Sequence, residues 1–336
     1  TDIGIDMAFF GNRLTFVADW YHKKTAGMLL SMPVPGYSGD SAPTGNLGDM
    51  LNQGIELDLG YRNSIGEFNY HASVNATYNK NTLTYLGDDA PSLYGSNHQT
   101  GQLTRGLVGL PFPYFYGFKS DGIFQNMDEV KAYTNAEGNM IMPNAEPGDV
   151  RFVDIDGDGV IGDGDKTYIG KGIPDWVFGI NLGFDWKGLD FNVLLQGQLG
   201  AQAYNVSRRI DLGAVNLPKY MLNRWTGEGT SDKYPKFEVG DATNYVVSDV
   251  WVEDASFLRA RNVQLGYTLP QKITKKFFVQ RFRVYAQAEN LFTLTKYQGC
   301  DPEVTGGNSG YGTEVGIDRG VYPQSRTFSV GVNLTF

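Results

Sequence analysis

A short acidic stretch near the middle of the chain combines residue types that suit metal binding. Residues 154–165 read DIDGDGVIGDGD, with acidic residues at the first, third and fifth positions and glycine at the sixth. This spacing is typical of a calcium loop, in which carboxylate and carbonyl oxygens surround a hard cation and the glycine permits a sharp turn. The candidate ligands are Asp154, Asp156, Asp158, the carbonyl of Val160, Asp163 and Asp165.

Two features of this loop leave a second interpretation open. The twelfth position is Asp165 and not glutamate, which shortens its bidentate reach, and no helical pattern flanks the loop. The alternative is a solvated cluster of Asp-Gly turns on the surface. If calcium binds here, we expect a structural ion that braces a long loop.

The remaining chemically active residue types do not form a recognisable catalytic pattern. His22, His71 and His98 lie far apart in the sequence, and we interpret His71 as a polar lining residue. Cys300 is the only cysteine, which excludes an intrachain disulfide and a multi-cysteine metal site. We therefore predict that the chain is not an enzyme.

Aromatic residues of the long loops have two interpretations. They could stack on sugar rings, or they could pack the loops together, and packing is the interpretation that we favour. These residues are Tyr114, Phe115, Tyr116, Trp225, Tyr234 and Tyr245.

The elements that must position these residues are predicted to be strands. The clearest is 325–336, where apolar residues at every second position from Phe328 to Phe336 alternate with small or polar ones. Alternate side chains of a strand point to opposite faces, so one face suits lipid and the other a wet lumen. The nine predicted strands lie near residues 3–9, 14–20, 55–61, 68–79, 178–186, 189–196, 263–269, 282–297 and 325–336.

Connections between these strands alternate between short turns and long polar loops. Soluble sandwiches seldom separate loop lengths in this way, whereas outer-membrane barrels have short turns at one end and long loops at the other. The pattern therefore indicates an all-β fold, an antiparallel transmembrane β-barrel. An extra hairpin is predicted within the aromatic stretch 112–118. The long loops are expected at about 31–50, 86–175, 204–254 and 298–324.

Composition agrees with a barrel and argues against other classes. The 336 residues are 41% hydrophobic, and we find no run of about 18 apolar residues that would span a membrane as a helix. The formal net charge of −9 argues against nucleic-acid binding, which needs a basic surface. A large soluble β-protein with one wet face remains the alternative, but it would need a partner for nine apolar faces.

Four motifs give the chain a resemblance to a known family. They are YFYGFKSDGIFQ at 114–125, PGDVRFVDIDGDG at 147–159, SFLRARNVQLGY at 256–267, and AENLFTLTKY at 288–297 followed by DPEV at 301–304. Together these motifs resemble the C-terminal half of the SusC/RagA family of TonB-dependent outer-membrane transporters of Bacteroidetes. The resemblance covers essentially the whole chain.

The resemblance implies a 22-stranded barrel closed by an N-terminal plug, in the outer membrane of a Gram-negative bacterium. Such a protein actively imports oligosaccharides or peptides, with TonB pulling on the plug and a SusD-like surface lipoprotein as a lid. Its outer face would contact membrane lipid and lipopolysaccharide. Because Thr1 already lies within an alternating pattern, we expect the plug and the first strands to be absent from this chain.

A second hypothesis assigns the chain to a different class of function. An outer-membrane binding or adhesion protein could use the same barrel, with calcium-braced loops that grip a surface ligand and no transport. An upstream plug and a TonB-contacting segment would favour the importer over this alternative.

Overall fold

The computed structural model describes residues 1–336 except 32–43, 88–91, 99–100, 208–210, 242 and 305–311. Its main feature is a ten-stranded sheet in which nine strands follow one another and a short tenth, β19 (Thr293–Thr295), extends one edge of β17. The nine strands in order are β1 (Asp2–Phe9), β2 (Leu14–Ser31), β3 (Thr44–Ile65), β4 (Phe68–Leu86), β13 (Trp176–Trp186), β14 (Leu189–Leu199), β17 (Phe257–Thr268), β18 (Arg281–Glu289) and β21 (Thr327–Thr335).

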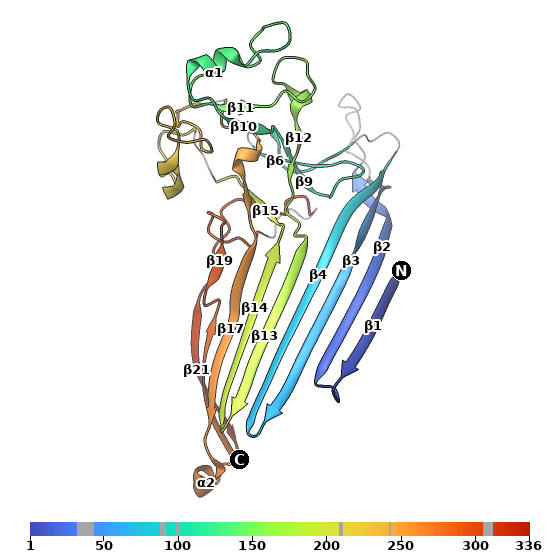
Figure 1. Cartoon of the computed structure of the whole chain (residues 1–336), viewed down its shortest axis with the longest axis vertical. Coiled ribbons are helices and arrows are strands. Elements are labelled where there is room, and N and C mark those ends of the chain that lie inside the picture. The colour runs from blue at the N-terminus through green and yellow to red at the C-terminus, as the bar shows by residue number, and fades with distance from the viewer. Residues whose placement is uncertain (32–43, 88–91, 99–100, 208–210, 242, 305–311) are drawn as a thin grey trace.

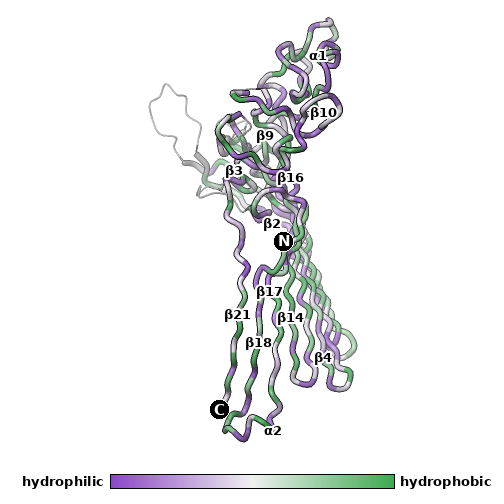
Figure 2. Tube along the Cα trace, turned by 90° about the vertical axis from the view of Figure 1, so that its left-hand side faces the viewer, coloured by the Kyte–Doolittle hydropathy of each residue, from purple (hydrophilic) through white to green (hydrophobic). Residues whose placement is uncertain are grey.

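Every pair of neighbouring strands in this sheet is antiparallel, and the register keeps the two faces chemically distinct. One row across the sheet aligns Leu59 with Val74 and Val74 with Ile180. The next row aligns Asp58 with Asn75, on the opposite face. Figure 2 shows the alternation of hydropathy along the strands. The predicted antiparallel sheet with one apolar and one polar face is thus confirmed.

The two ends of the sheet differ in how their strands are connected. Three hairpins at one end turn within a few residues, between β1 and β2, β3 and β4, and β13 and β14. Gly66 and Gly188 support two of these turns with positive φ angles of 61° and 89°, which a residue with a side chain rarely adopts. At the other end the connections are long and form the upper part of the molecule in Figure 1.

The long connections fold against one another. A four-stranded sheet runs in the order β12-β9-β8-β5, and a three-stranded sheet in the order β16-β15-β20. A buried cluster that includes Phe115, Tyr204, Trp251 and Ile317 joins connections far apart in the sequence. The strands concerned are β5 (Leu93–Tyr94), β8 (Thr104–Gly106), β9 (Tyr114–Gly117), β12 (Thr167–Gly170), β15 (Gln202–Asn205), β16 (Val252–Asp254) and β20 (Ile317–Asp318).

Smaller elements complete this upper region. Strand β10 pairs with β11, and β6 pairs with β7. None of the helices among the described residues has both the length and the apolar content needed to cross a membrane. The smaller elements are β6 (Asn97–His98), β7 (Gly101–Gln102), β10 (Ser120–Ile123), β11 (Val150–Phe152), α1 (Met127–Ala132), and the 3-10 helices η2 (Asp163–Asp165), η3 (Lys219–Asn223) and η4 (Asp249–Trp251).

Three sequence predictions about the elements need correction. The predicted strand 282–297 is two strands, since the chain leaves the ladder at Asn290, which has a φ angle of 51°. The predicted hairpin at 112–118 is instead strand β9, which pairs with β8 and β12. Strand β3 starts at Thr44, so part of the loop expected at 31–50 is strand, while 32–43 lies outside the described residues.

Candidate functional site

The polar face of the sheet carries fixed charges near its short-turn end. Two nitrogens of the Arg283 guanidinium donate to Asp190, Nε to Oδ1 at 2.9 Å and a terminal nitrogen to Oδ2 at 2.5 Å. The same guanidinium donates to the Gln264 side chain at 3.0 Å. Gly266 leaves room for this pair, because a Cβ there would lie within 2.6 Å of both Asp190 oxygens. The polar face therefore carries a fixed ion pair at this end of the sheet.

A second charged network lies on β17 nearer the loops. Arg259 is buried and donates to Asp301 at 2.6 Å and to Glu303 at 3.0 Å. Arg261 donates to the same Glu303 carboxylate at 2.6 Å and to the Gln196 side chain at 2.9 Å. The network holds the segment that carries Asp301 and Glu303 against the wall.

Electrostatics fix the protonation state of Asp301 within this network. Burial alone would raise its pKa, but the backbone N–H groups of Glu303 and Gln324 and the Arg259 guanidinium hydrogen-bond its carboxylate. Their combined effect holds the pKa of Asp301 below its usual value. Asp301 is therefore ionised at neutral pH and serves as the counter-ion of Arg259.

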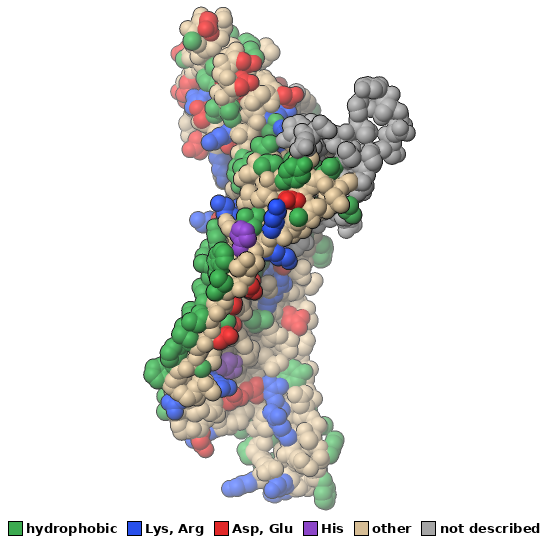
Figure 3. Space-filling view, turned by 90° about the vertical axis from the view of Figure 1, so that its right-hand side faces the viewer, with side chains coloured by type: hydrophobic (Ala, Val, Ile, Leu, Met, Phe, Trp, Pro, Cys, Tyr) green, Lys and Arg blue, Asp and Glu red, His purple; other side chains and the backbone are tan. Residues whose placement is uncertain are grey.

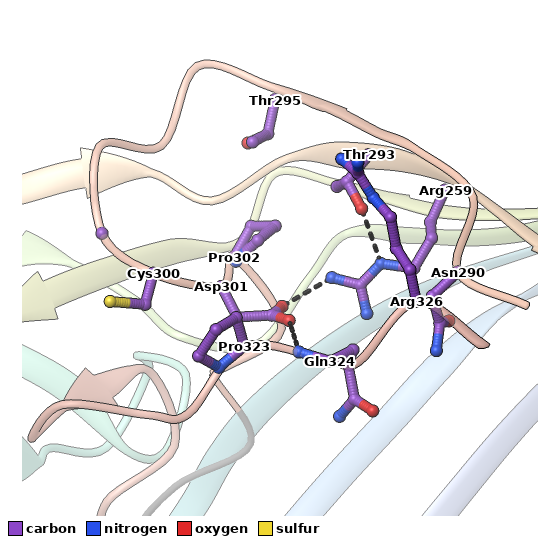
Figure 4. A pocket seen from close by; sticks show the side chains of 11 residues that line it. Arg259, Asn290, Thr293, Thr295, Cys300, Asp301, Pro302, Pro323, Gln324 and Arg326 are labelled. Atoms are coloured by element: carbon purple, nitrogen blue, oxygen red, sulfur yellow. Dashed lines mark hydrogen bonds and ion pairs between the residues drawn. The ribbon is translucent and has the colours of Figure 1, made fainter.

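A pocket of about 240 Å³ opens beside this network. Figure 4 shows Arg259, Asp301 and Gln324 converging on one side of it, while the Cys300 sulfur points away from them. The pocket is lined by Arg326 as well as Arg259, and the uncharged polar side chains of Asn290, Thr293, Thr295 and Gln324 complete a lining that offers hydrogen bonds to a polar group.

The acidic loop is placed among the long connections, between β11 and β12. One carboxylate oxygen each from Asp154, Asp156 and Asp158 lie within 4.8 Å of one another. The Asp154 carboxylate accepts hydrogen bonds from the N–H groups of Gly157 and Gly159, at 2.8 and 2.9 Å. The loop is thus curled so that three of the predicted ligands face a common point.

The three remaining predicted ligands are placed differently. Asp165 is fully buried and closes the loop, since its carboxylate accepts from the N–H groups of Ile155 at 2.6 Å and Gly162 at 2.7 Å. Asp163 is exposed and pairs with Lys166 at 2.7 Å, and this pairing lowers the pKa of Asp163. The Val160 backbone N–H donates to the Asp158 carboxylate.

Aromatic residues of the loops mostly pack inward. Tyr114, Phe115, Tyr234 and Tyr245 are buried, and Phe115 and Tyr245 belong to the main cluster of the loop region. Packing is therefore the right interpretation for these four. His71 lies on the polar face, with its Nε2 atom 3.5 Å from the Asn192 amide, as expected of a lining residue.

Sequence reasoning did not find the Arg259 network. The two arginines lie in the 256–267 motif and the two carboxylates in the DPEV segment at 301–304, and nothing in their spacing shows that they meet in space. The only available signal was the occurrence of two arginines and two acidic residues within motifs of otherwise neutral composition.

Comparison with protein families and solved structures places this geometry among known proteins. The family model described as "TonB dependent receptor-like, beta-barrel" matches residues 1–291. A curated relative, TonB-dependent receptor P3 of Formosa agariphila, is 32% identical over 343 residues, which cover 100% of this chain and 34% of the relative. TonB-dependent receptor SusC of Bacteroides thetaiotaomicron is 29% identical over 345 residues, covering 99% and 31% of the two chains.

Solved structures give the same result for the fold. A chain in the structure of the RagAB peptide importer in its "open-open" state superposes with a TM-score of 0.77 at 26% identity, over 100% of this chain and 34% of that one. The structure of the RagAB peptide transporter gives a TM-score of 0.77 at 28% identity. This chain spans about a third of the length of the relatives that it matches.

Proposed function

The chain belongs to the TonB-dependent receptor β-barrel family, and on that basis we propose that it forms wall and outer loops of an active outer-membrane importer. The observation that carries this proposal is the ten-stranded antiparallel sheet with one apolar face, one charged face and all long loops at one end. An apolar outer face suits lipid, and closure with further strands would satisfy the backbone of both edge strands.

We propose that the whole protein adds the remaining strands and a plug, on which TonB pulls from the periplasm. The charged face of this sheet would then line the passage and contact the plug. Figure 3 shows acidic and basic side chains gathered on one face, flanked by hydrophobic ones. The proposed location is the outer membrane, with the short turns in the periplasm and the connections 86–175, 204–254 and 298–324 outside.

For substrate we propose an oligosaccharide or a peptide too large for a passive porin. The RagAB importer named above is described as a peptide importer, and the likeness to its chain supports a peptide as one of the two candidates. The folded loops offer a preformed platform for a SusD-like lipoprotein, which we propose as the lid.

Growth on defined nutrients tests this function. A strain lacking the full gene and a strain lacking TonB should both fail to grow on the same member of a panel of oligosaccharides and peptides. The gene restored on a plasmid should rescue growth only in cells that retain TonB. Normal growth of the deletion strain on every member of the panel would contradict the importer.

We also propose that the acidic loop binds a structural Ca²⁺ ion. The ligands would be the carboxylates of Asp154, Asp156 and Asp158, the Val160 carbonyl and Asp165, a set of hard oxygen donors of the kind calcium prefers. Asp163 is left out because Lys166 holds its carboxylate. The ion would brace the connection between β11 and β12.

Calcium titration of the purified full-length receptor by calorimetry tests this second proposal. Asp156→Asn should weaken calcium binding about tenfold or more, since it removes a charged ligand. Asp163→Asn removes the same charge from the neighbouring turn and should leave the affinity unchanged. Equal effects of the two variants, or no calcium-dependent heat in the parent protein, would rule out the site.

A further inference from the structure

One turn at the short-turn end differs from the other three. Strands β17 and β18 are joined by residues 269–280, which contain a short helix, α2 (Gln271–Thr274), and a 3-10 helix, η5 (Lys275–Phe277). The segment is tied to the sheet at both ends, because Leu269 N–H donates to Phe282 and Gln280 N–H donates to Thr335. Figure 1 shows α2 projecting beyond the ends of the neighbouring strands.

This segment carries three lysines close together. Lys272, Lys275 and Lys276 are all exposed. At this end of the sheet, the ion pairs found within the described part of the chain join Lys187 to Glu67 and Arg283 to Asp190, and none involves the three lysines. The segment therefore presents an unneutralised positive cluster on a protein whose net charge is −9.

The same segment exposes large apolar side chains beside the lysines. Phe277 is 70% exposed, Phe278 90% and Ile273 48%. Phe278 also has a left-handed backbone, with φ 62° and ψ 21°, which favours glycine or asparagine and disfavours a bulky residue. Glycine or asparagine at position 278 would stabilise the turn better than phenylalanine does. The presence of Phe278 therefore indicates that its ring makes a contact outside the chain.

The position of the segment indicates what that contact is. It continues the apolar outer face, where Phe282 lies opposite Leu334 on β21 and Phe336 is 76% exposed. Figure 2 shows α2 at the lower end of the sheet, below β18 and beside the C-terminus. Aromatic side chains beside lysines, at the edge of a lipid-facing surface, are the arrangement that places rings at the acyl boundary and ammonium groups among headgroups.

We propose that residues 270–279, here called the basic turn, bind anionic phospholipid in the periplasmic leaflet of the membrane. Phe277 and Phe278 enter the leaflet, while Lys272, Lys275 and Lys276 bind headgroup phosphates. The inference rests on the membrane-spanning barrel proposed above. A protein partner would need a groove for two exposed phenyl rings, whereas the lipid leaflet of the proposed barrel adjoins them.

Lipid retention by the full-length receptor tests the proposal. The receptor is reconstituted into vesicles of phosphatidylethanolamine with phosphatidylglycerol, released in mild detergent and examined by native mass spectrometry. Changing Lys272, Lys275 and Lys276 together to Gln should lower the preference for phosphatidylglycerol by about fivefold per lysine, the fold-change that corresponds to about 1 kcal/mol. The matched control changes the exposed Lys131, Lys219 and Lys233 to Gln and should keep the preference.

A second measurement examines the aromatic side chains without altering charge. Phe278→Trp should add fluorescence that is quenched by lipids brominated on their acyl chains, measured as the difference from the parent protein, whose chain already contains five tryptophans. The fluorescence added by Leu222→Trp, which replaces a residue that is 74% exposed in the loop region, should not be quenched. The backbone strain at residue 278 is unchanged by this substitution, so folding of the turn is preserved.

The outcomes separate this inference from the importer proposal. Two results would contradict lipid binding by the basic turn while leaving the barrel proposal intact, provided that the receptor enters the vesicles. One is an unchanged phosphatidylglycerol preference without the three lysines, and the other is no quenching at residue 278. A receptor that does not enter lipid vesicles overturns both proposals. Lost preference and quenching together support the proposal.

Discussion

At the scale of single residues, Arg259 shows how this wall holds its loops. Its guanidinium is buried between Asp301 and Glu303, so it joins β17 to a segment more than forty positions away in sequence. Removing one partner of a buried ion pair leaves the other charge without compensation, which costs far more than losing an exposed pair. The structure therefore makes Arg259 a positioning residue for the 296–304 segment.

The variant Arg259→Met tests that role. It should lower the local free energy of unfolding of the 296–304 segment by about 3 kcal/mol, because Asp301 is left buried and ionised. Hydrogen exchange of the full-length receptor in detergent measures this change. The control Arg319→Met breaks the partly exposed pair with Glu314 and should cost at most about 1 kcal/mol. Equal protection in the two variants would contradict the assignment.

The stability difference between the parent protein and Arg259→Met should depend on pH. The pKa of Asp301 is lowered in the folded protein, so its ionic contribution is fully present above the unfolded value of about 3.9 and is lost as the pH falls through the folded value. The stability gap between parent and Arg259→Met should therefore be constant near neutrality and shrink on acidification, as Asp301 becomes protonated first in the variant, where the Arg259 guanidinium no longer lowers its pKa. A gap that widened on acidification would show that Asp301 is not the group concerned.

The acidic loop was only partly predictable from its sequence. The spacing of Asp154, Asp156 and Asp158 was enough to predict that their carboxylates lie close together, because a short glycine-rich loop can adopt few conformations. Spacing could not show that Lys166 holds Asp163, since that depends on the 3-10 turn at 163–165. Calcium occupancy itself stays a prediction.

At the scale of elements, the nine wall strands were predictable because period-two alternation is strong wherever one face meets lipid and the other water. The alternation did not reveal residues 44–54 of β3, because polar residues such as Asp49 and Asn52 lie on both faces of that part of the strand. The short strands of the loops were missed because they pair over long distances, as β15 does with β20. Strands of two to four residues contain too little pattern to predict.

A pair of adjacent substitutions tests which face of the sheet meets lipid. Val74 lies on the apolar face between Leu59 and Ile180, whereas Asn75 lies opposite Asp58 on the polar face. Val74→Arg should destabilise the full-length receptor by about 2–4 kcal/mol, since it places a charge in hydrocarbon. Asn75→Arg should change stability by about 0.5 kcal/mol or less, because its charge remains in a wet lumen beside Asp58.

Unfolding of the receptor from lipid vesicles by chaotrope gives both free energies. The comparison is sharp because the two positions are adjacent on one strand and the introduced side chain is the same. A greater loss for Asn75→Arg would mean that the two faces are assigned the wrong way round.

At the scale of the whole molecule, this chain is a curved antiparallel sheet with its long connections folded together at one end. The sheet has two unpaired edge strands, β1 and β21, among the residues that the structure describes, and further strands would have to close it in lipid. Family motifs predicted this architecture from sequence. They could not predict the substrate, because the side chains of this sheet line only part of the proposed passage.

Uptake of the growth-supporting substrate tests the central claim, energised import through this barrel, most directly. Initial uptake of that labelled oligosaccharide or peptide is measured in cells with and without the full gene, each with and without TonB. Energised import requires that uptake be rapid only when both are present. Uptake that requires the gene but persists without TonB would describe a passive pore and contradict energised import.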